Sequence, residues 1–177
     1  MNSLDDLKSS IISQFGTPCS VIDLDIIESN IQRAQKICDA AGVANRPHIK
    51  THKSPVLAKM QINAGARGIT CQKLGEAEVM ADAGIYDILI ATNILGAARS
   101  GRLTKLQKKI PLKVCADNSV SLKEYSKAAQ AANRPLDVLI ECDTGQKRAG
   151  VEKTSEALNL IKSIIEDKWL KFIGLLY

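Results

Sequence analysis

Both histidines of this 177-residue chain and two lysines lie within six residues, in the segment 46–53 (RPHIKTHK). An apolar, strand-like pattern gives way to a helical pattern at this point, so Lys50 is predicted to stand at the end of a strand. At the end of a strand the backbone fixes the direction of a lysine side chain, and the ammonium can reach into a pocket. A lysine that forms a Schiff base requires both. A solvated basic turn is the alternative interpretation, because most lysines lie in water. The rest of the chain favours the catalytic interpretation.

The composition predicts a folded globular protein. Hydrophobic residues make up 45% of the chain, which is enough for a sizeable core, and no run of 18 apolar residues predicts a membrane span. The first six residues (MNSLDD) are acidic and lack the apolar centre of a signal peptide. We therefore expect a cytoplasmic protein with no membrane partner.

The cysteines are spread singly along the chain, without a CxxC pair, and their number is odd. They are Cys19, Cys38, Cys71, Cys115 and Cys142. This pattern argues against a disulfide framework and against a zinc site of paired cysteines. The last three lie in or beside apolar runs, where a thiol packs as a small hydrophobic group.

The net charge of +5 raises the question of nucleic-acid binding. The basic residues are scattered rather than clustered, and aromatic residues make up only 3% of the chain, so little is available to stack on bases. We expect no nucleic-acid partner, since a small anionic ligand explains local positive charge equally well.

Short apolar runs rich in β-branched residues alternate with helical patterns. The runs cover residues 69–71, 87–91, 112–116, 136–142 and 172–177. This alternation predicts right-handed βαβ units and a parallel sheet. Beginning near residue 47 we count about six repeats, against the eight of a (β/α)8 barrel. An open doubly wound sheet of six strands and a barrel cut short both fit the pattern.

Capping residues precede the helical patterns. They are Asp25 with Glu28 three residues on, Ser54 before Pro55, Asn118 or Ser119, and Thr154. Gly42, Gly65 and Gly84 stand where helices would end. The helix boundaries therefore agree with the alternation of strands and helices.

Four motifs occur in order: residues 17–25 (TPCSVIDLD), 46–53, 68–78 (GITCQKLGEAE) and 143–151 (DTGQKRAGV). Together they resemble the D-threonine aldolase and D-serine dehydratase family, which are pyridoxal-phosphate enzymes of the alanine racemase, or fold type III, class. The resemblance covers nearly all of the chain from residue 17. It implies an α/β fold of the (β/α)8 barrel type, incomplete here with about six of the eight units.

The resemblance also implies a domain organisation. Residues 1–16 would be an N-terminal segment, and residues 17–177 a truncated pyridoxal-phosphate-binding barrel domain with the family's C-terminal β domain absent. In the family each active site of a dimer is completed by the partner's second domain. We therefore expect the full-length form to be a homodimer.

Lys50 matches the lysine that carries pyridoxal 5'-phosphate in the family. In an extended strand His48 points to the same side as Lys50, at the C-terminal face of the barrel where catalysis occurs. Lys53 is the rival lysine, expected in the following loop or first helical turn with a less constrained stem. His52 either lines the pocket or caps the turn.

Two further cofactor-binding residues follow from the resemblance. Arg148 matches an arginine placed against the cofactor's phenolic oxygen, where its constant charge stabilises the phenolate. Tyr177 matches an aromatic residue near the phosphate or the ring. No catalytic role is assigned to Gln72, Lys73 or Glu76, because helix capping and solvation explain them as well.

The implied activity is that of a pyridoxal-phosphate-dependent lyase, which cleaves small D-β-hydroxy-α-amino acids to glycine and an aldehyde. D-serine dehydratase-like elimination, racemisation and cofactor carriage on the same fold remain alternatives. In the family a divalent metal, Mn or Zn, is held by the second domain, so no metal ligand is assigned here. Because many barrels bind phosphate at their last two strands, we predict that this chain alone binds the cofactor weakly or not at all.

Overall fold

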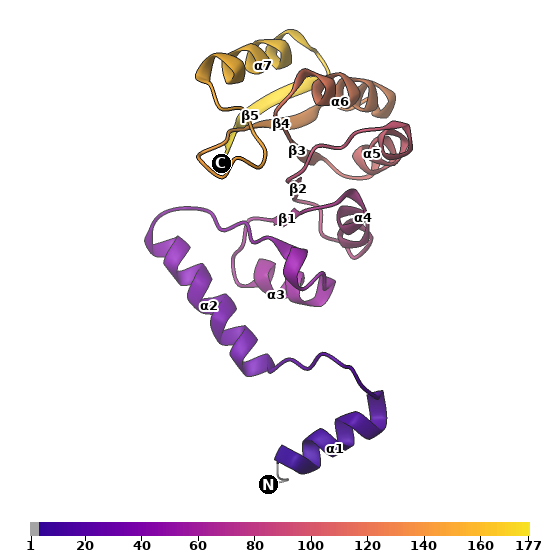
Figure 1. The fold of residues 1–177 in the computed structure, drawn as a ribbon, viewed down its shortest axis with the longest axis vertical. Helices are drawn as coiled ribbons and strands as arrows, with labels where there is room; N and C mark the ends of the chain where they lie inside the picture. Colours follow the sequence, from indigo (N-terminus) through magenta and orange to yellow (C-terminus); the bar gives the residue numbers. More distant parts are fainter. Residues whose placement is uncertain (1–3) are drawn as a thin grey trace.

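The computed structural model describes residues 4–177, so the first three residues of the acidic N-terminus lie outside the described residues. Helices and strands alternate through most of the chain (Figure 1). In chain order the elements are α1 (Leu4–Phe15), α2 (Leu24–Ala40), the 3-10 helix η1 (Ile49–Thr51), α3 (Pro55–Asn63), β1 (Ile69–Cys71), α4 (Leu74–Asp82), β2 (Ile88–Ile90), α5 (Ala97–Lys109), β3 (Leu112–Ala116), α6 (Ser119–Ala132), β4 (Leu136–Glu141), α7 (Thr154–Glu166) and β5 (Leu170–Leu176).

The sheet decides between the two architectures that the strand pattern left open, and it confirms the barrel that the resemblance implied. Its five strands are parallel and lie in the order β1-β2-β3-β4-β5, each joined to the next by a helix. A doubly wound sheet reverses its strand order at a switch point, whereas barrel strands follow one another in sequence. The fold is therefore an arc of a (β/α) barrel, with α4, α5 and α6 along one side of the strands (Figure 1).

The five apolar runs form strands within a few residues of the predicted bounds, but the expected first strand does not form. Only a single parallel bridge, between His48 and Thr70, pairs this segment with the sheet. The amide of Thr70 donates to the carbonyl of Pro47 at 2.8 Å. The chain then enters η1, so the prediction that Lys50 ends a strand was wrong. A histidine side chain that caps the turn is the physical reason, as the site geometry shows.

The core lies between the helices and one face of the sheet. Along β4, Leu136, Val138 and Ile140 are buried, while the residues between them are half-buried on the other face. Tyr125 of α6 is fully buried, and its hydroxyl accepts from the amide of Ile94 at 3.0 Å. Along β4 the alternation of burial therefore shows which face of the strand meets the helices.

Most helix boundaries match the prediction. Ser54 and Asn118 cap α3 and α6 as predicted, with each side-chain oxygen accepting from an amide of the first turn. The start of α2 was placed two residues late, because Asp23 is the cap and accepts from the amide of Ile26 at 3.1 Å. The start of α7 was placed late by one residue, because Thr154 is its first helical residue.

The N-terminal helices extend away from the sheet (Figure 1). α1 has no buried residue, and residues 17–23 form neither a helix nor a strand. Within the described part of the chain, no helix is long and apolar enough to cross a membrane.

A cluster of charges stabilises the N-terminal edge of the sheet. Asp87 Oδ1 lies 2.8 Å from both Arg46 Nη1 and Lys113 Nζ. Partial burial would raise the pKa of Asp87, but the two cations outweigh this and hold it below its usual value. In barrels this edge serves stability, and the chemistry belongs at the opposite edge.

Candidate active site

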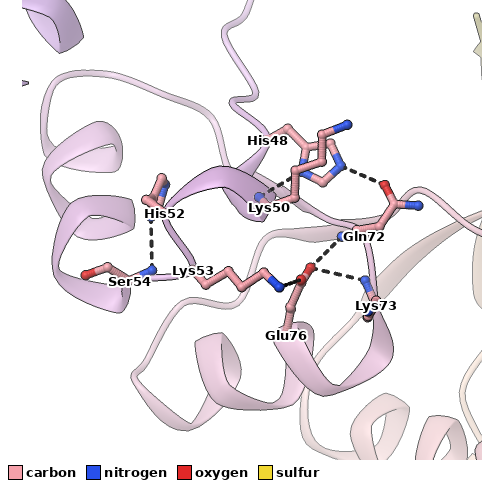
Figure 2. A network of polar contacts seen from close by, with 8 residues as sticks. All are labelled: His48, Lys50, His52, Lys53, Ser54, Gln72, Lys73 and Glu76. Atoms are coloured by element: carbon pink, nitrogen blue, oxygen red, sulfur yellow. Dashed lines mark hydrogen bonds and ion pairs between the residues drawn. The ribbon is translucent and has the colours of Figure 1, made fainter. Parts of the chain in front are cut away.

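The segment 48–54, here called the lysine turn, is held by side chains that bond its own backbone (Figure 2). His48 Nδ1 accepts from the amide of Lys50 at 3.2 Å, and His52 Nδ1 accepts from the amide of Ser54 at 3.0 Å. Ser54 Oγ then accepts from the amide of Leu57 at 3.4 Å and begins α3. Local bonds of this kind compete with strand pairing, which explains why η1 replaces the expected strand.

The lysine turn is tied to the sheet through His48. Since Nδ1 accepts a hydrogen bond, the proton of the neutral ring lies on Nε2, which donates to Gln72 Oε1 at 3.2 Å. Gln72 Nε2 lies 3.5 Å from the carbonyl oxygen of Ala91, the residue that follows β2. Partial burial and the ammonium of Lys50 lower the pKa of His48, against the opposing effects of Gln72 and Glu76. His48 is therefore a neutral support for the lysine at pH 7.

The two candidate lysines differ in what holds their amines. Lys53 Nζ lies 3.5 Å from Glu76 Oε1, and Glu76 Oε2 also accepts from the amides of Gln72 and Lys73. Among the described residues the side chain of Lys50 has no hydrogen bond or ion pair. Figure 2 shows its amine turned away from Glu76. Lys53 was expected to be the less constrained lysine, and the structure shows the opposite.

The two amines also open onto different cavities. Lys53 lines a cavity of about 540 Å³ beside the first turn of α4, together with Lys73, Arg99 and Arg102. Lys50 lines a separate cavity of about 210 Å³, here called the lysine pocket. The two candidate lysines therefore belong to different cavities.

The lysine pocket brings together all four residues predicted to bind the cofactor: His48, Lys50, Arg148 and Tyr177. The first two precede β1, whereas Arg148 follows β4 and Tyr177 follows β5. The pocket therefore lies at the C-terminal edge of the strands, where barrel enzymes carry their chemistry. The roles of the four residues stay predictions.

The lysine pocket is shallow and open. Lys50 and Arg148 are exposed, and Tyr177 is 84% exposed. Its volume lies below the range of about 300–1,000 Å³ that is usual for small-molecule sites. The described residues thus form one wall of a site rather than an enclosure.

The polar residues of the pocket to which sequence reasoning gave no role include Gln72, Glu141 and Asp143. Each stands at or just beyond the C-terminal end of a strand, β1 for Gln72 and β4 for the two carboxylates. That position was the available signal, because the C-terminal ends of parallel strands meet at one edge of the sheet.

The cysteines of the strands pack as the sequence predicted. Burial, with a smaller effect of Glu76, raises the pKa of Cys71 to about 12. Burial and the neighbouring Glu141 raise the pKa of Cys115 as well. Both thiols are protonated at neutral pH and are poor nucleophiles. Cys142 is only partly buried.

Arg148 is carried by residues 143–150, here called the arginine loop. A bridge between Cys142 and Val151 closes the loop at its base, with the amide of Asp143 donating to the carbonyl of Val151 at 2.9 Å. Asp143 Oδ1 also accepts from the amide of Gly145 at 2.8 Å and shapes the first turn. In the described residues no cluster of three or more His, Cys, Asp or Glu side chains could hold a metal ion.

The chain belongs to the family described as alanine racemase, N-terminal domain, whose model matches residues 22–177. It is 38% identical to the D-threonine aldolase of Arthrobacter sp. over 93% of this chain and 43% of that protein. It is 36% identical to the D-threo-3-hydroxyaspartate dehydratase of Delftia sp. over 90% of this chain and 42% of that protein.

The solved structures agree with this assignment. The crystal structure of D-threonine aldolase from Filomicrobium marinum superposes with a TM-score of 0.87 at 38% identity, over 90% of this chain and 43% of that one. The chain therefore spans less than half the length of these relatives.

Proposed function

We propose that this chain forms the lysine-bearing wall of a pyridoxal-phosphate-dependent lyase that cleaves D-β-hydroxy-α-amino acids to glycine and an aldehyde. One observation carries the proposal: a single pocket unites Lys50 and His48, from before β1, with Arg148 and Tyr177, from beyond β4 and β5. The similarity to a D-threonine aldolase over 93% of the chain supports the choice of reaction.

The residues present fit the reactive side of this cofactor. Lys50 offers the cofactor's aldehyde an amine that has no competing partner among the described residues. Arg148, in the same cavity, offers a guanidinium to the cofactor's phenolic oxygen. When bound, pyridoxal phosphate supplies an electron sink that weakens the bonds to the substrate's Cα. Tyr177 is proposed to lie near the ring or the phosphate, and no other described residue of the pocket is assigned to the phosphate.

The residues around the two lysines have distinct proposed tasks. Lys50 binds the cofactor, and the backbone on which it stands is fixed by His48, whose neutral ring is held in turn by Gln72. Arg148 keeps a constant positive charge in the pocket, because a guanidinium does not lose its proton. Lys53 remains paired with Glu76 and supports the turn.

Reductive trapping tests the assignment of the lysine even when the cofactor binds weakly. The chain is incubated with pyridoxal phosphate, reduced with borohydride, digested and mapped by mass spectrometry. We expect the label on Lys50 in the wild type and in Lys53→Ala, the matched control, and its loss from this segment in Lys50→Ala. A label chiefly on Lys53 would contradict the proposal. The same holds if the wild type and Lys50→Ala are labelled to an equal extent, and only at other surface lysines.

Dehydration is a second candidate activity, favoured by the 36% identity to the D-threo-3-hydroxyaspartate dehydratase. The two reactions give different products from different substrates. Aldehyde release from D-threonine, with none from L-threonine, supports the aldolase. Pyruvate release from D-serine supports the dehydratase. Loss of either activity in Lys50→Ala, with retention in Lys53→Ala, connects it to the lysine pocket.

A further inference from the structure

The arginine loop depends on another part of the sheet for its position. Besides the bond at its base, the loop has two hydrogen bonds among the described residues. One is the local bond between Gly145 and Asp143, and the other joins the loop to a residue at the end of another strand. In that second bond the amide of Gly150 donates to Asp117 Oδ2 at 3.0 Å. Asp117 directly follows β3, so this bond ties the loop after β4 to the neighbouring strand.

Asp117 is itself held in a fixed orientation. Its Oδ1 accepts from Asn93 Nδ2 at 2.8 Å and from Asn118 Nδ2 at 2.7 Å. Ser121, which is buried, donates from its hydroxyl to Asn93 Oδ1 at 2.7 Å. Since Asn93 follows β2, one carboxylate connects the C-terminal ends of β2, β3 and β4.

The backbone at Gly150 is built for this contact. Its φ is +99°, and a Cβ there would lie 2.6 Å from both the amide nitrogen of Asp143 and the carbonyl carbon of Cys142. Glycine is thus needed both for the backbone conformation and for the close approach of the two ends of the loop. The amide that meets Asp117 is two residues from Arg148.

The carboxylate stays ionised under these bonds. Partial burial would raise the pKa of Asp117, but the hydrogen bonds from Gly150, Asn118 and Asn93 outweigh it and hold this pKa below its usual value. The bond to the loop is therefore a charge-assisted one, which is stronger than a bond between neutral groups.

We propose that Asp117 is a positioning residue, which acts through Gly150 to hold the arginine loop, and with it Arg148, against the lysine pocket. The inference rests on the proposed function, in which Arg148 acts on the cofactor. It adds a residue that lies outside the pocket and that no sequence motif of the chain singled out. In this proposal the polar residues that follow β2 and β3, namely Asn93, Asp117 and Asn118, serve the site by holding the arginine loop in place.

Hydrogen exchange of the whole chain tests the tie itself. In Asp117→Ala we expect the amide of Gly150 to exchange about ten- to a hundred-fold faster, the range for loss of a hydrogen bond to a charged group. Asp117→Asn, which keeps an acceptor oxygen without the charge, should lie between this variant and the wild type. Glu124→Gln, on the surface of α6, is the control and should leave the loop unchanged. Unchanged protection of Gly150 in Asp117→Ala would overturn the proposal.

A spectroscopic measurement tests the consequence for Arg148. The visible absorbance of the chain with pyridoxal phosphate is followed across pH in wild type, Arg148→Gln, Asp117→Ala and Asp117→Asn. We expect Asp117→Ala to shift the pH profile in the same direction as Arg148→Gln, with partial recovery in Asp117→Asn. A released loop with a wild-type profile would show that Asp117 is merely structural and overturn the proposal.

The failure of the proposed function gives a different result. In that case no borohydride-trapped label appears on Lys50 in the wild type, whatever the exchange rate at Gly150. Labelling of Lys50 in both wild type and Asp117→Ala, without any change in the profile, leaves the function standing and refutes the role of Asp117.

Discussion

The two sides of the lysine pocket are built in opposite ways. The lysine turn is fixed from within, by His48, His52 and Ser54, each of which accepts a hydrogen bond from an amide within three residues. Apart from the bond at its base between Asp143 and Val151, the arginine loop has one bond to the rest of the described chain, from Gly150 to Asp117. The backbone of one side is therefore set mainly by bonds between near neighbours in the sequence, with a further tie from His48 to Gln72, whereas the other side is set by a neighbouring strand.

This difference has a physical consequence for the site. Bonds between residues close in sequence close short loops and cost little chain entropy, so the lysine turn is expected to form as soon as η1 and α3 form. The tie of the arginine loop spans 33 residues and requires β3 and β4 to be paired first. The position of Lys50 should thus tolerate damage that moves Arg148.

The largest effect that separates the two sides is expected for Gly150→Ala. The positive φ and the contacts at 2.6 Å force the base of the loop apart. We expect a loss of about 1–3 kcal/mol in the free energy of unfolding, the usual cost of a strained backbone position. Denaturant unfolding measures this loss, and hydrogen exchange should show faster exchange in the arginine loop while the lysine turn stays protected.

The matched control makes the same substitution where there is room. Gly101 lies exposed in α5 with nothing within 4 Å of a Cβ, so Gly101→Ala should stabilise the chain by about 0.5–1 kcal/mol. Equal effects of the two variants would mean that the base of the arginine loop does not require a glycine.

A smaller effect is expected on the opposite side, for Ser54→Ala. This variant removes the cap of α3 and should cost about 1 kcal/mol of unfolding free energy. Exchange should quicken in the lysine turn and at the start of α3, with no change at Gly150. The control is Ser163→Ala in α7, where the hydroxyl only bonds back to the carbonyl of Asn159. A loosened arginine loop in Ser54→Ala would contradict the independence of the two sides.

Much of the fold was predictable because its signals are local. The apolar runs and the caps Ser54 and Asn118 lie within a few residues of the elements that they define. The choice between barrel and doubly wound sheet was not predictable from the pattern, since strand order depends on pairings between distant segments. The strand expected at Lys50 was wrong because a side chain, His48, bonds the backbone and turns it into η1.

The same distinction between local signals and distant partners applies to the site. Lys50, His48, Arg148 and Tyr177 were predicted from the resemblance to a family, and the structure brings them to one pocket. Gln72 and Asp117 were not found, because their partners lie 24 and 33 residues away, in His48 and Gly150 respectively. Only the arrangement of the strands brings these partners together.

The smallest effect is a difference in how the two sides respond to acid. In the fold the pKa of His48 and of His52 lies below the ordinary 6.5, chiefly through burial, so the unfolded chain takes up protons first as the pH falls. Their contribution to stability is complete above pH 6.5 and is lost as the pH falls through the folded values, because a proton on Nδ1 breaks the bond from the backbone amide. The pKa of Asp117 lies below the ordinary 3.8, so its contribution is kept until the pH falls below that value.

We therefore expect the free energy of unfolding to decline between pH 7 and pH 5, and to decline less in a variant that carries both His48→Gln and His52→Gln. The amide proton signal of Gly150, followed by NMR, should stay constant over this range and shift only in the range of carboxylate titration. A shift of that signal together with the histidine ring signals would show that the two sides of the pocket are coupled.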